Sequence, residues 1–428
     1  MASRLTVEDP FNSDSATRIG FLLESFPTLS QTFVINQITG LIDRGFDVRI
    51  YARNGSRDRE VHAAVEKYGL IGRTYYFGSG LERLSRNSRA LQLVKSLATR
   101  RDRRVWASLN VMRFGKQAVN LKKFLLFEAL VASGLDCCHV VICHFGTNGL
   151  VGSDLKQMGL ITGKMVVVFH GYDITKYIGQ HGSQVYSRLF ELCDLVLPIS
   201  ERWKTELVIL GCDLAKIRVH RMGVDTKLLP YVSPAQENRP FKLLSVGRLV
   251  EKKGIQFGIA AIKSLSKMTH DEITYDIIGD GPLRACLEEQ IATDGLTDTV
   301  KLLGEQNPEA CIAAMQRADV LIVPSVTAAD GDQEGIPVVL MEAMSLGLPV
   351  ITTRHSGIPE LVENNFSGLL TAEHDSDGIA RAILKLMGDR KQMEALARNA
   401  RDTVEANFNN DILGKQLSNL ITSSLAGF

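Results

Sequence analysis

The feature that most constrains the fold of this chain is a repeated alternation of short apolar runs with stretches of helical periodicity. Most of these runs are apolar throughout instead of alternating in polarity. Continuous apolar runs are typical of strands buried on both faces, as in a parallel sheet covered by helices. The pattern therefore predicts an α/β chain with right-handed strand–helix–strand crossovers. The expected strands are residues 18–23, 47–51, 140–144, 165–169, 194–198, 242–246, 274–278, 300–303, 320–324 and 350–352.

One polar stretch divides this pattern into two similar halves. The chain has 428 residues, and a typical domain has roughly 150. Residues 231–240 contain two prolines and lack any periodicity, as expected of an interdomain linker. Two facing domains would place a ligand site in the cleft between them, because such folds bind ligands at the carboxyl ends of their strands. We predict a tail, two domains separated by a linker, and a C-terminal helix, at residues 1–17, 18–230, 231–240, 241–405 and 406–428.

Composition excludes several classes of protein. Hydrophobic residues make up 45% of the chain and charged residues 23%, which is incompatible with disorder over most of its length. The 49 basic and 48 acidic residues nearly balance, so the overall charge predicts no nucleic-acid partner. No apolar run approaches the ~20 residues of a membrane-spanning helix. Acidic residues stand where a secretory signal would be basic, and no C-x-x-C pair occurs among the seven cysteines, so we expect a cytoplasmic protein.

A cluster of cysteine and histidine residues raises the question of a metal site. It consists of Cys137, Cys138, His139, Cys143 and His144. Its spacing fits no common zinc pattern. Because residues 140–144 are predicted as a buried strand, in which free cysteine is common, we interpret the cluster as structural and predict no metal.

Residues 83–104 form a strongly basic segment. They contain eight basic residues and one acidic residue, and Leu91, Val94 and Leu97 lie among them at helical spacing. This pattern predicts a basic amphipathic helix suited to an anionic membrane surface. A solvated helix with an ordinary core face is an equally consistent interpretation. Residues 1–120 hold 19 basic and 11 acidic residues, so positive charge is concentrated in this part of the chain.

Two basic residues follow a predicted strand in the second half. Arg248 and Lys253 lie in "SVGRLVEKKG", after the strand at 242–246 and before a helical stretch. Cations beside a helix N-terminus favour the binding of a diphosphate. Gly279 and Gly281 of "IIGDGP" follow the next strand, where glycine lets a backbone approach a ligand closely.

The most specific segment is "VPSVTAADGDQEGIPVVLMEAMSLGLPVITT". A loop rich in glycine and acidic residues precedes a helix, and Pro337 suits the first helical turn. Glu334 precedes the helix and Glu342 lies within it. Glu342 interrupts a nearly apolar stretch, where a carboxylate is costly unless it is hydrogen-bonded. Ribose hydroxyls would satisfy this carboxylate, and so would backbone N–H groups in a purely structural role.

Polar residues also follow strands in the first half. His170 and Asp173 of "VVVFHGYD" follow the strand at 165–169, and Ser25, Thr28 and Ser30 lie in the first predicted strand–helix loop. These are positions at which doubly wound sheets bind ligands.

Together, these motifs resemble the retaining glycosyltransferases of family 4, whose GT-B fold has two Rossmann-like domains. The motifs are "FHGYD", "VGRLVEKKG", "IIGDGP", "EGIPVVLME" and "GLPVITT" with "GIPELV". The resemblance covers nearly the whole chain from residue 18. The segment "FPTLSQTFVINQITGLIDRGFDVRIYA" is similar to a subgroup that builds bacterial exopolysaccharides, such as colanic acid and amylovoran. The resemblance implies parallel sheets facing a central cleft and a C-terminal helix that crosses back to the first domain.

The resemblance also implies roles for individual residues. Arg248 and Lys253 correspond to the cations that bind the donor diphosphate, and Glu342 to the carboxylate that takes the ribose hydroxyls. Glu334 and His170 correspond to catalytic groups beside the donor sugar. The remaining donor-side positions are Gly279, Gly281, Glu305, Gly335, Ile336 and Pro337. The acceptor-side positions are Ser25, Thr28, Ser30, His144 and Asp173.

The implied reaction is the retaining, metal-independent transfer of a hexose to a lipid-linked exopolysaccharide oligosaccharide. The implied donor is a nucleotide sugar, a UDP-sugar in preference to GDP-mannose, and no cofactor is expected because Arg248, Lys253 and a helix N-terminus can neutralise the leaving diphosphate. Asp330 and Asp332 are interpreted as loop carboxylates. The implied location is the inner face of the cytoplasmic membrane, by peripheral contact with its anionic surface. A sugar-nucleotide epimerase, a phosphorylase and a non-catalytic sugar-binding module remain the alternatives.

Overall fold

The computed structural model describes residues 16–28, 31–56, 62–78, 85–99, 102–232 and 240–426. The described residues form two compact units. The first unit comprises residues up to 143 together with 151–165, and the second comprises 144–150 and 166–426. Most of the predicted tail and linker, at 1–15 and 233–239, lies outside the described residues. The domain boundaries proposed from the sequence stay a prediction.

The strands of the first sheet run parallel, as the continuous apolar runs predicted. β1 (Arg18–Phe26) pairs with β2 (Asp47–Gly55) and with β4 (Val140–His144), and β2 also pairs with β3 (Thr74–Tyr76). The sheet has the order β3-β2-β1-β4-β5-β6. Such an order, which reverses direction next to β1, is typical of a doubly wound fold.

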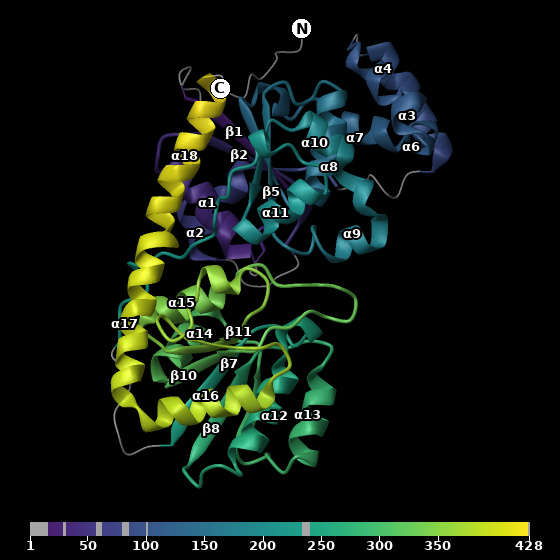
Figure 1. The fold of residues 1–428 in the computed structure, drawn as a ribbon. Helices are drawn as coiled ribbons and strands as arrows, with labels where there is room; N and C mark the ends of the chain where they lie inside the picture. Colours follow the sequence, from purple (N-terminus) through teal and green to yellow (C-terminus); the bar gives the residue numbers. More distant parts are fainter. Residues whose placement is uncertain are drawn as a thin grey trace. The chain divides into compact units, whose positions relative to one another are not determined.

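The helices of this part of the chain follow the strands in alternation (Figure 1). α1 buries Val34, Ile35, Ile38 and Leu41 on one face. The helices are α1 (Thr32–Ile42), α2 (Ala63–Lys67), α3 (Arg86–Thr99), α4 (Arg104–Ser108), α5 (Val111–Phe114), α6 (Lys116–Val119), α7 (Lys122–Leu130) and α8 (Gly146–Gln157).

Most of β5 (Lys164–Phe169) belongs to the second unit, where its residues 166–169 pair in parallel with β6 (Leu195–Pro198). The second unit also contains a second parallel sheet of order β12-β11-β10-β7-β8-β9. The strands of this sheet are β7 (Phe241–Val246), β8 (Ile273–Ile278), β9 (Val300–Gly304), β10 (Val320–Val323), β11 (Val350–Thr353) and β12 (Leu369–Thr371).

Helices cover both faces of the second sheet (Figure 1). Leu243 of β7 packs in one buried apolar cluster with residues of α12, α13 and α16, whereas Leu244 packs in another with residues of α14, α15 and α17. Neighbouring residues of one strand thus enter different cores, which explains the unbroken apolar runs. The helices of this unit are α9 (Lys176–His181), α10 (Ser187–Leu192), α11 (Glu201–Ile209), α12 (Ile255–Leu265), α13 (Arg284–Thr293), α14 (Pro308–Arg317), α15 (Val338–Leu346), α16 (Ser376–Gly388), α17 (Arg390–Asn407) and α18 (Asn410–Ala426).

The C-terminal helix α18 shares a cavity with residues from the N-terminal half of the sequence that belong to the same unit, and its predicted crossing to the first domain stays a prediction. Lys204 of α11 and Leu420 of α18 line one cavity of about 800 Å³ within the second unit. Among the described helices, none combines the length and the apolar character needed to cross a membrane.

All ten predicted strands are confirmed, and two corrections follow. β1 continues to Phe26, so Ser25 lies within the strand, opposite Asn54 of β2, and not in the following loop. β3 and β12 were not predicted, because each has only three residues and strands so short carry almost no periodic signal.

Candidate functional site

Two glycine-rich turns pack against each other at the carboxyl ends of β7 and β8. A side chain on Gly279 would place its Cβ 1.9 Å from the carbonyl oxygen of Gly247, and one on Gly281 would place its Cβ 2.5 Å from that of Leu249. Gly279 and Gly281 have φ values of 143° and 159°. Both positions therefore require glycine, and in this structure the close approach is to another turn of the same chain.

Arg248 and Lys253 lie at this strand end, next to the beginning of α12, as predicted. The Arg248 side chain is exposed and makes no hydrogen bond or ion pair with the described residues. Lys253 ends a short 3₁₀ helix, and Gly254 follows it with a left-handed φ of 64° before α12 begins at Ile255. Two cations and the N-terminus of an eleven-residue helix thus share one location, which favours an anion.

The carboxylate of Glu334 lies between two lysines. Lys253 Nζ donates to Glu334 Oε2 at 3.1 Å, and Lys252 Nζ lies 3.7 Å from Oε1. Burial alone would raise the pKa of the Glu334 carboxyl, but Lys253 and Lys252 outweigh burial and hold this pKa below its usual value. Glu334 is therefore ionised at neutral pH.

The contact from Lys252 was not predicted. In the sequence "EKKG", neither lysine carries a signal that shows which one turns inward. The 3₁₀ geometry of residues 251–253 leaves both side chains largely buried beside Glu334. Because Lys252 also donates to Asp332 Oδ1 at 3.2 Å, it contacts two of the three carboxylates of this loop.

Lysines also face the acidic pair of the loop. Lys176 Nζ lies 2.6 Å from Asp330 Oδ2, and this contact, together with the Asp332 N–H, lowers the pKa of Asp330. Within the described residues, no group of three or more histidine, cysteine or acidic side chains is placed to hold a metal ion. Asp330 and Asp332 are therefore loop carboxylates held by lysines, and independence from metal stays a prediction.

Glu342 has different surroundings from Glu334. It lies on α15, which begins directly after Pro337, the N-cap residue, and the neighbouring Ile336 is buried. The Glu342 side chain makes no hydrogen bond or ion pair with any described residue. Burial raises the pKa of its carboxyl to about 7. A half-buried acceptor without a protein partner is suited to bind hydroxyl groups of a ligand.

Two buried histidines lie at the ends of β4 and β5. His144 Nδ1 and His170 Nε2 are 3.1 Å apart. Burial, and then the neighbouring His220, lower the pKa of His144 to about 3, while burial and His144 lower the pKa of His170 well below its usual value. Both imidazoles are therefore neutral near pH 7, so His170 can form hydrogen bonds but does not carry a charge.

Asp173 supports the loop that carries His170. Its carboxylate is fully buried and accepts hydrogen bonds from the backbone N–H groups of Gly146, His170 and Gly171, at 2.8 to 3.0 Å. Burial nevertheless raises its pKa, against the opposing effect of these N–H groups. We predicted an acceptor-side role for Asp173 and His144. Neither side chain has exposed surface in this structure, and their acceptor-side role stays a prediction.

The structure brings the predicted catalytic residues His170 and Glu334 into neighbouring loops of the second unit. A side chain on Gly335 would place its Cβ 2.6 Å from the carbonyl oxygen of His170, and one on Gly171 would lie 3.4 Å from the Gly335 nitrogen. Gly335 is thus required by this backbone contact, which sets the distance between the two loops.

The other predicted positions are more dispersed. Glu305 is exposed and follows Gly304 at the end of β9. Ser25 and Thr28 belong to the first unit, where Thr28 Oγ1 donates to the Ser25 carbonyl oxygen at 3.3 Å. Ser30 lies outside the described residues.

Comparisons with solved structures show the same fold. A sucrose-phosphate synthase from Thermosynechococcus elongatus matches with a TM-score of 0.72 at 21% identity, over 96% of this chain and 100% of that one. Anabaena Alr3699/HepE in complex with UDP and glucose matches with a TM-score of 0.69 at 17% identity, over 95% and 99%. These likenesses confirm the predicted GT-B architecture of two parallel sheets flanked by helices.

Comparisons of sequence extend the likeness to full-length relatives. The family model "Glycosyl transferases group 1" matches residues 232–403. The chain is 38% identical over 415 residues to the putative colanic acid biosynthesis glycosyltransferase WcaL of Escherichia coli (strain K12), covering 94% of this chain and 99% of that protein. It is 37% identical over 413 residues to the amylovoran biosynthesis glycosyltransferase AmsK of Erwinia amylovora, with the same coverage. The chain therefore belongs to the group 1 family of glycosyl transferases and is a glycosyltransferase.

Proposed function

We propose that this glycosyltransferase moves a hexose from a nucleoside diphosphate sugar, a UDP-sugar in preference to GDP-mannose, to a lipid-linked oligosaccharide of an exopolysaccharide. The observation that carries the proposal is the pair Arg248 and Lys253 beside the N-terminus of α12. The names of the relatives WcaL and AmsK support the exopolysaccharide acceptor. The UDP and glucose bound by Alr3699/HepE, which has the same fold, support a UDP-sugar.

The chemistry follows from the charges at this site. Departure of a nucleoside diphosphate develops negative charge on the β-phosphate, and Arg248, Lys253 and the helix N-terminus would stabilise it without a metal. Glu334 would stabilise the positive charge that develops on the sugar ring. Because its carboxylate is shared by two ammonium groups, Glu334 is a poor nucleophile. We therefore propose that the configuration is retained through attack on the front face of the sugar.

A screen of nucleotide sugars tests the donor. A ligand present at 100 times its Kd stabilises the folded protein by about 2.7 kcal/mol. We expect a UDP-sugar to raise the melting temperature more than GDP-mannose does, and NMR of the product to show retained anomeric configuration. Consumption of the donor without an acceptor would favour an epimerase, and the absence of any nucleotide-sugar response would contradict the proposal.

The lipid-linked acceptor implies contact with an anionic membrane, for which the first unit has a suitable surface. Residues 85–127 hold eleven basic residues and one acidic residue. In α3, Ser96 is buried and bonds Glu128, while Leu91 and Val94 are 72% and 63% exposed. This arrangement is the reverse of an ordinary core-facing helix, which favours the membrane interpretation over the solvated helix.

Exposed apolar side chains also occur on the helices that follow α3 in the chain. Trp106 of α4 is 63% exposed and Met112 of α5 is fully exposed. Exposed basic residues of this stretch of the chain include Lys95, Arg103, Lys116 and Lys122. Apolar side chains surrounded by cations are typical of a surface that inserts shallowly into an anionic bilayer.

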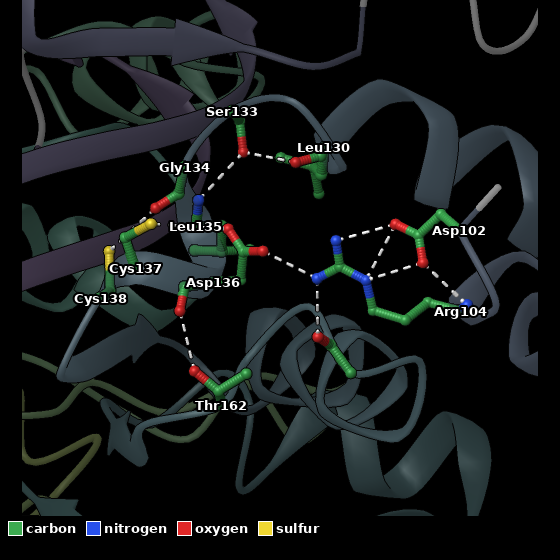
Figure 2. Close-up of polar contacts among 11 residues, drawn as sticks. Asp102, Arg104, Leu130, Ser133, Gly134, Leu135, Asp136, Cys137, Cys138 and Thr162 are labelled. Carbon is green, nitrogen blue, oxygen red and sulfur yellow. Dashed lines mark hydrogen bonds and ion pairs between the residues drawn. The ribbon is translucent and has the colours of Figure 1, made fainter. Parts of the chain in front are cut away.

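Arg104, in contrast, is an anchor and not a membrane contact. Figure 2 shows its guanidinium between two carboxylates: Nη2 donates to Asp102 at 2.8 Å and Nη1 to Asp136 at 2.7 Å. Nη1 also donates to the Gly159 carbonyl oxygen at 3.3 Å. Arg104 therefore fastens the beginning of α4 to the body of the first unit and should be left unchanged in tests of membrane binding.

Sedimentation with liposomes of phosphatidylglycerol and phosphatidylcholine tests this surface. Each basic residue near an anionic membrane contributes about 1 kcal/mol, so glutamine at Lys95, Arg103, Lys116 and Lys122 should lower the affinity by roughly a hundredfold or more at low salt. A control variant with glutamine at four exposed cations of the second unit, Lys267, Lys301, Lys391 and Arg398, should bind like the parent. Equal binding of both variants, or no binding of the parent at low salt, would contradict the proposal.

A further inference from the structure

A buried histidine–glutamate pair contacts the loop that carries Glu334. His355 follows β11 and has no exposed surface. Its Nε2 accepts the backbone N–H of Glu334 at 3.0 Å, and its Nδ1 lies 2.7 Å from Glu373 Oε1. The other oxygen of Glu373 accepts the backbone N–H of Thr327 at 2.7 Å. One pair of side chains thus binds two backbone groups of the same loop.

The hydrogen-bonding roles in this chain of contacts follow from the backbone groups. The N–H of Glu334 can only donate, so His355 Nε2 must accept. The proton of the neutral imidazole therefore resides on Nδ1, from which it is donated to the Glu373 carboxylate. Burial alone would raise the pKa of the Glu373 carboxyl, but the Thr327 N–H and His355 outweigh burial and lower it, so Glu373 remains an ionised acceptor.

The two contacts hold the two ends of the loop that follows β10. Thr327 lies near its beginning and Glu334 near its end. Between them, the loop has its own turn, in which Ala328 N–H donates to the Asp332 carbonyl oxygen at 3.0 Å. The residues that hold both ends come from outside the loop, after β11 and β12. They fix the loop as a unit relative to the second sheet.

We propose that His355 is a positioning residue for glycosyl transfer, which with Glu373 fixes the peptide preceding Glu334 and so directs its carboxylate toward the donor sugar. This inference rests on the proposed role of Glu334 beside that sugar. The Glu334 N–H fixes the plane of the peptide, and the Glu334 side chain emerges from it between Lys252 and Lys253. Loss of the acceptor would leave a buried N–H without a partner. Rotation of the peptide would let this N–H find another acceptor, and it would move the Glu334 carboxylate.

Two substitutions of His355 separate positioning from simple structural support. Glutamine can accept from Glu334 with its amide oxygen and donate to Glu373 with its amide nitrogen, whereas His355→Leu can do neither. Since a displacement of about 1 Å can cost a hundredfold in rate, we expect kcat of His355→Leu to fall by roughly that factor. His355→Gln should retain most of the activity, and both variants should bind the nucleoside diphosphate like the parent, because Arg248 and Lys253 are untouched.

Hydrogen exchange provides a readout that does not depend on activity. The amides of Thr327 and Glu334 should exchange faster in His355→Leu than in the parent, and at parental rates in His355→Gln. The control His270→Leu removes an exposed histidine of the second unit and should change neither exchange nor kcat.

The outcomes distinguish this inference from the proposed function. Unchanged kcat in His355→Leu, or equal loss in both His355 variants together with loss of nucleotide binding, would overturn the positioning role. If the parent itself neither binds nor uses a nucleotide sugar, the proposed function fails. Unprotected amides at positions 327 and 334 in the parent would then still overturn the proposal that His355 and Glu373 hold this loop, independently of any activity.

Discussion

The loop before α15 and the helix itself place the same functional group in opposite surroundings. In the loop, two lysines contact Glu334 and keep its pKa low. Eight residues later, in the helix, Glu342 makes no hydrogen bond or ion pair with the described residues, and burial raises the pKa of its carboxyl to about 7. Among the described residues, Glu334 has two ion-pair partners, whereas Glu342 has none.

This difference suggests how the two glutamates divide their work. A carboxylate that is already ionised and held by cations is available as a fixed charge at the moment of reaction. A carboxylate that is costly in the empty protein gains most from a ligand that brings hydroxyl groups. The loop therefore suits the chemical step and the helix suits recognition of the donor, and four predictions test this division.

The largest effect should come from removing either of the two cations between β7 and α12. Arg248→Ala or Lys253→Ala should each cost about 3–4 kcal/mol of transition-state stabilisation, a fall of roughly 10²- to 10³-fold in the rate of transfer, and should weaken binding of the nucleoside diphosphate. Lys253→Ala should also raise the pKa of Glu334 toward that of Glu342. Circular dichroism should show a folded protein, because Lys252 remains beside the carboxylate. The control Lys267→Ala, beyond the other end of α12, should behave like the parent, and near-normal turnover of both site variants would exclude the assignment.

The next effect concerns recognition by Glu342. Hydrogen bonds to a charged group contribute about 1.5 kcal/mol or more, so Glu342→Gln should raise the Kd for the donor by roughly tenfold at pH 8. The hydroxyls of the ribose bind the ionised carboxylate better, so affinity of the parent should increase as the pH rises through about 7. Titration calorimetry between pH 5.5 and 8 measures the slope of donor affinity against pH. The slope should be absent in Glu342→Gln and present in the control Glu309→Gln, and an equal slope in all three proteins would refute the role of Glu342.

A smaller effect should appear in the stability of the ligand-free protein. The folded pKa of Glu342, about 7, lies above its unfolded value, so its ionisation opposes folding. The stability associated with this group is fully present below the unfolded pKa of about 4.3 and is lost as the pH rises through the folded value. The free energy of unfolding of Glu342→Gln should therefore exceed that of the parent by on the order of 1 kcal/mol at pH 8 but not at pH 4. Its melting temperature should be higher at pH 8 only. A constant difference at both pH values would show that ionisation is not its cause.

The smallest effect should be that of a chelator. Because Lys176 and Lys252 occupy the surroundings of Asp330 and Asp332, we expect transfer to continue in EDTA at the parental rate. The assay compares activity before and after exhaustive dialysis against EDTA. Complete loss of transfer activity that is restored by Mg²⁺ or Mn²⁺ would show that these two carboxylates bind a metal in the working enzyme, in addition to their contacts with lysines.

The strands could be predicted because they depend on local patterns, and the candidate site positions were chosen from the same patterns, at the ends of those strands. Leu243 and Leu244 are apolar neighbours that enter different cores, and Arg248 directly follows the strand that contains them. The same rule, polar residues at strand ends, could have found His355 after the strand at 350–352. Its partner Glu373 was hidden because it follows β12, whose three residues gave no recognisable pattern.

Other features depend on strand order or on local geometry that no sequence pattern encodes. His355 contacts Glu373 because β11 and β12 are neighbours in the sheet, and this adjacency is not visible along the chain. Likewise, the inward turn of Lys252 depends on a 3₁₀ helix of three residues. The burial of Asp173 depends on three backbone N–H groups from two loops, which propensity cannot indicate.

The packing of the turns at β7 and β8 has a consequence for the entropy of binding. Gly247 N–H donates to the Ile278 carbonyl oxygen and Leu249 N–H to that of Asp280, each at 2.9 Å. The backbone on either side of Arg248 is therefore fixed before any ligand arrives, and only the torsions of its long side chain remain to be ordered. Immobilising such a side chain costs about 0.5–1.5 kcal/mol, whereas ordering a mobile loop would cost about 1–2 kcal/mol for every residue. Binding of the proposed diphosphate at this position would therefore require only the Arg248 side chain to be ordered, and no segment of backbone would have to fold around the ligand.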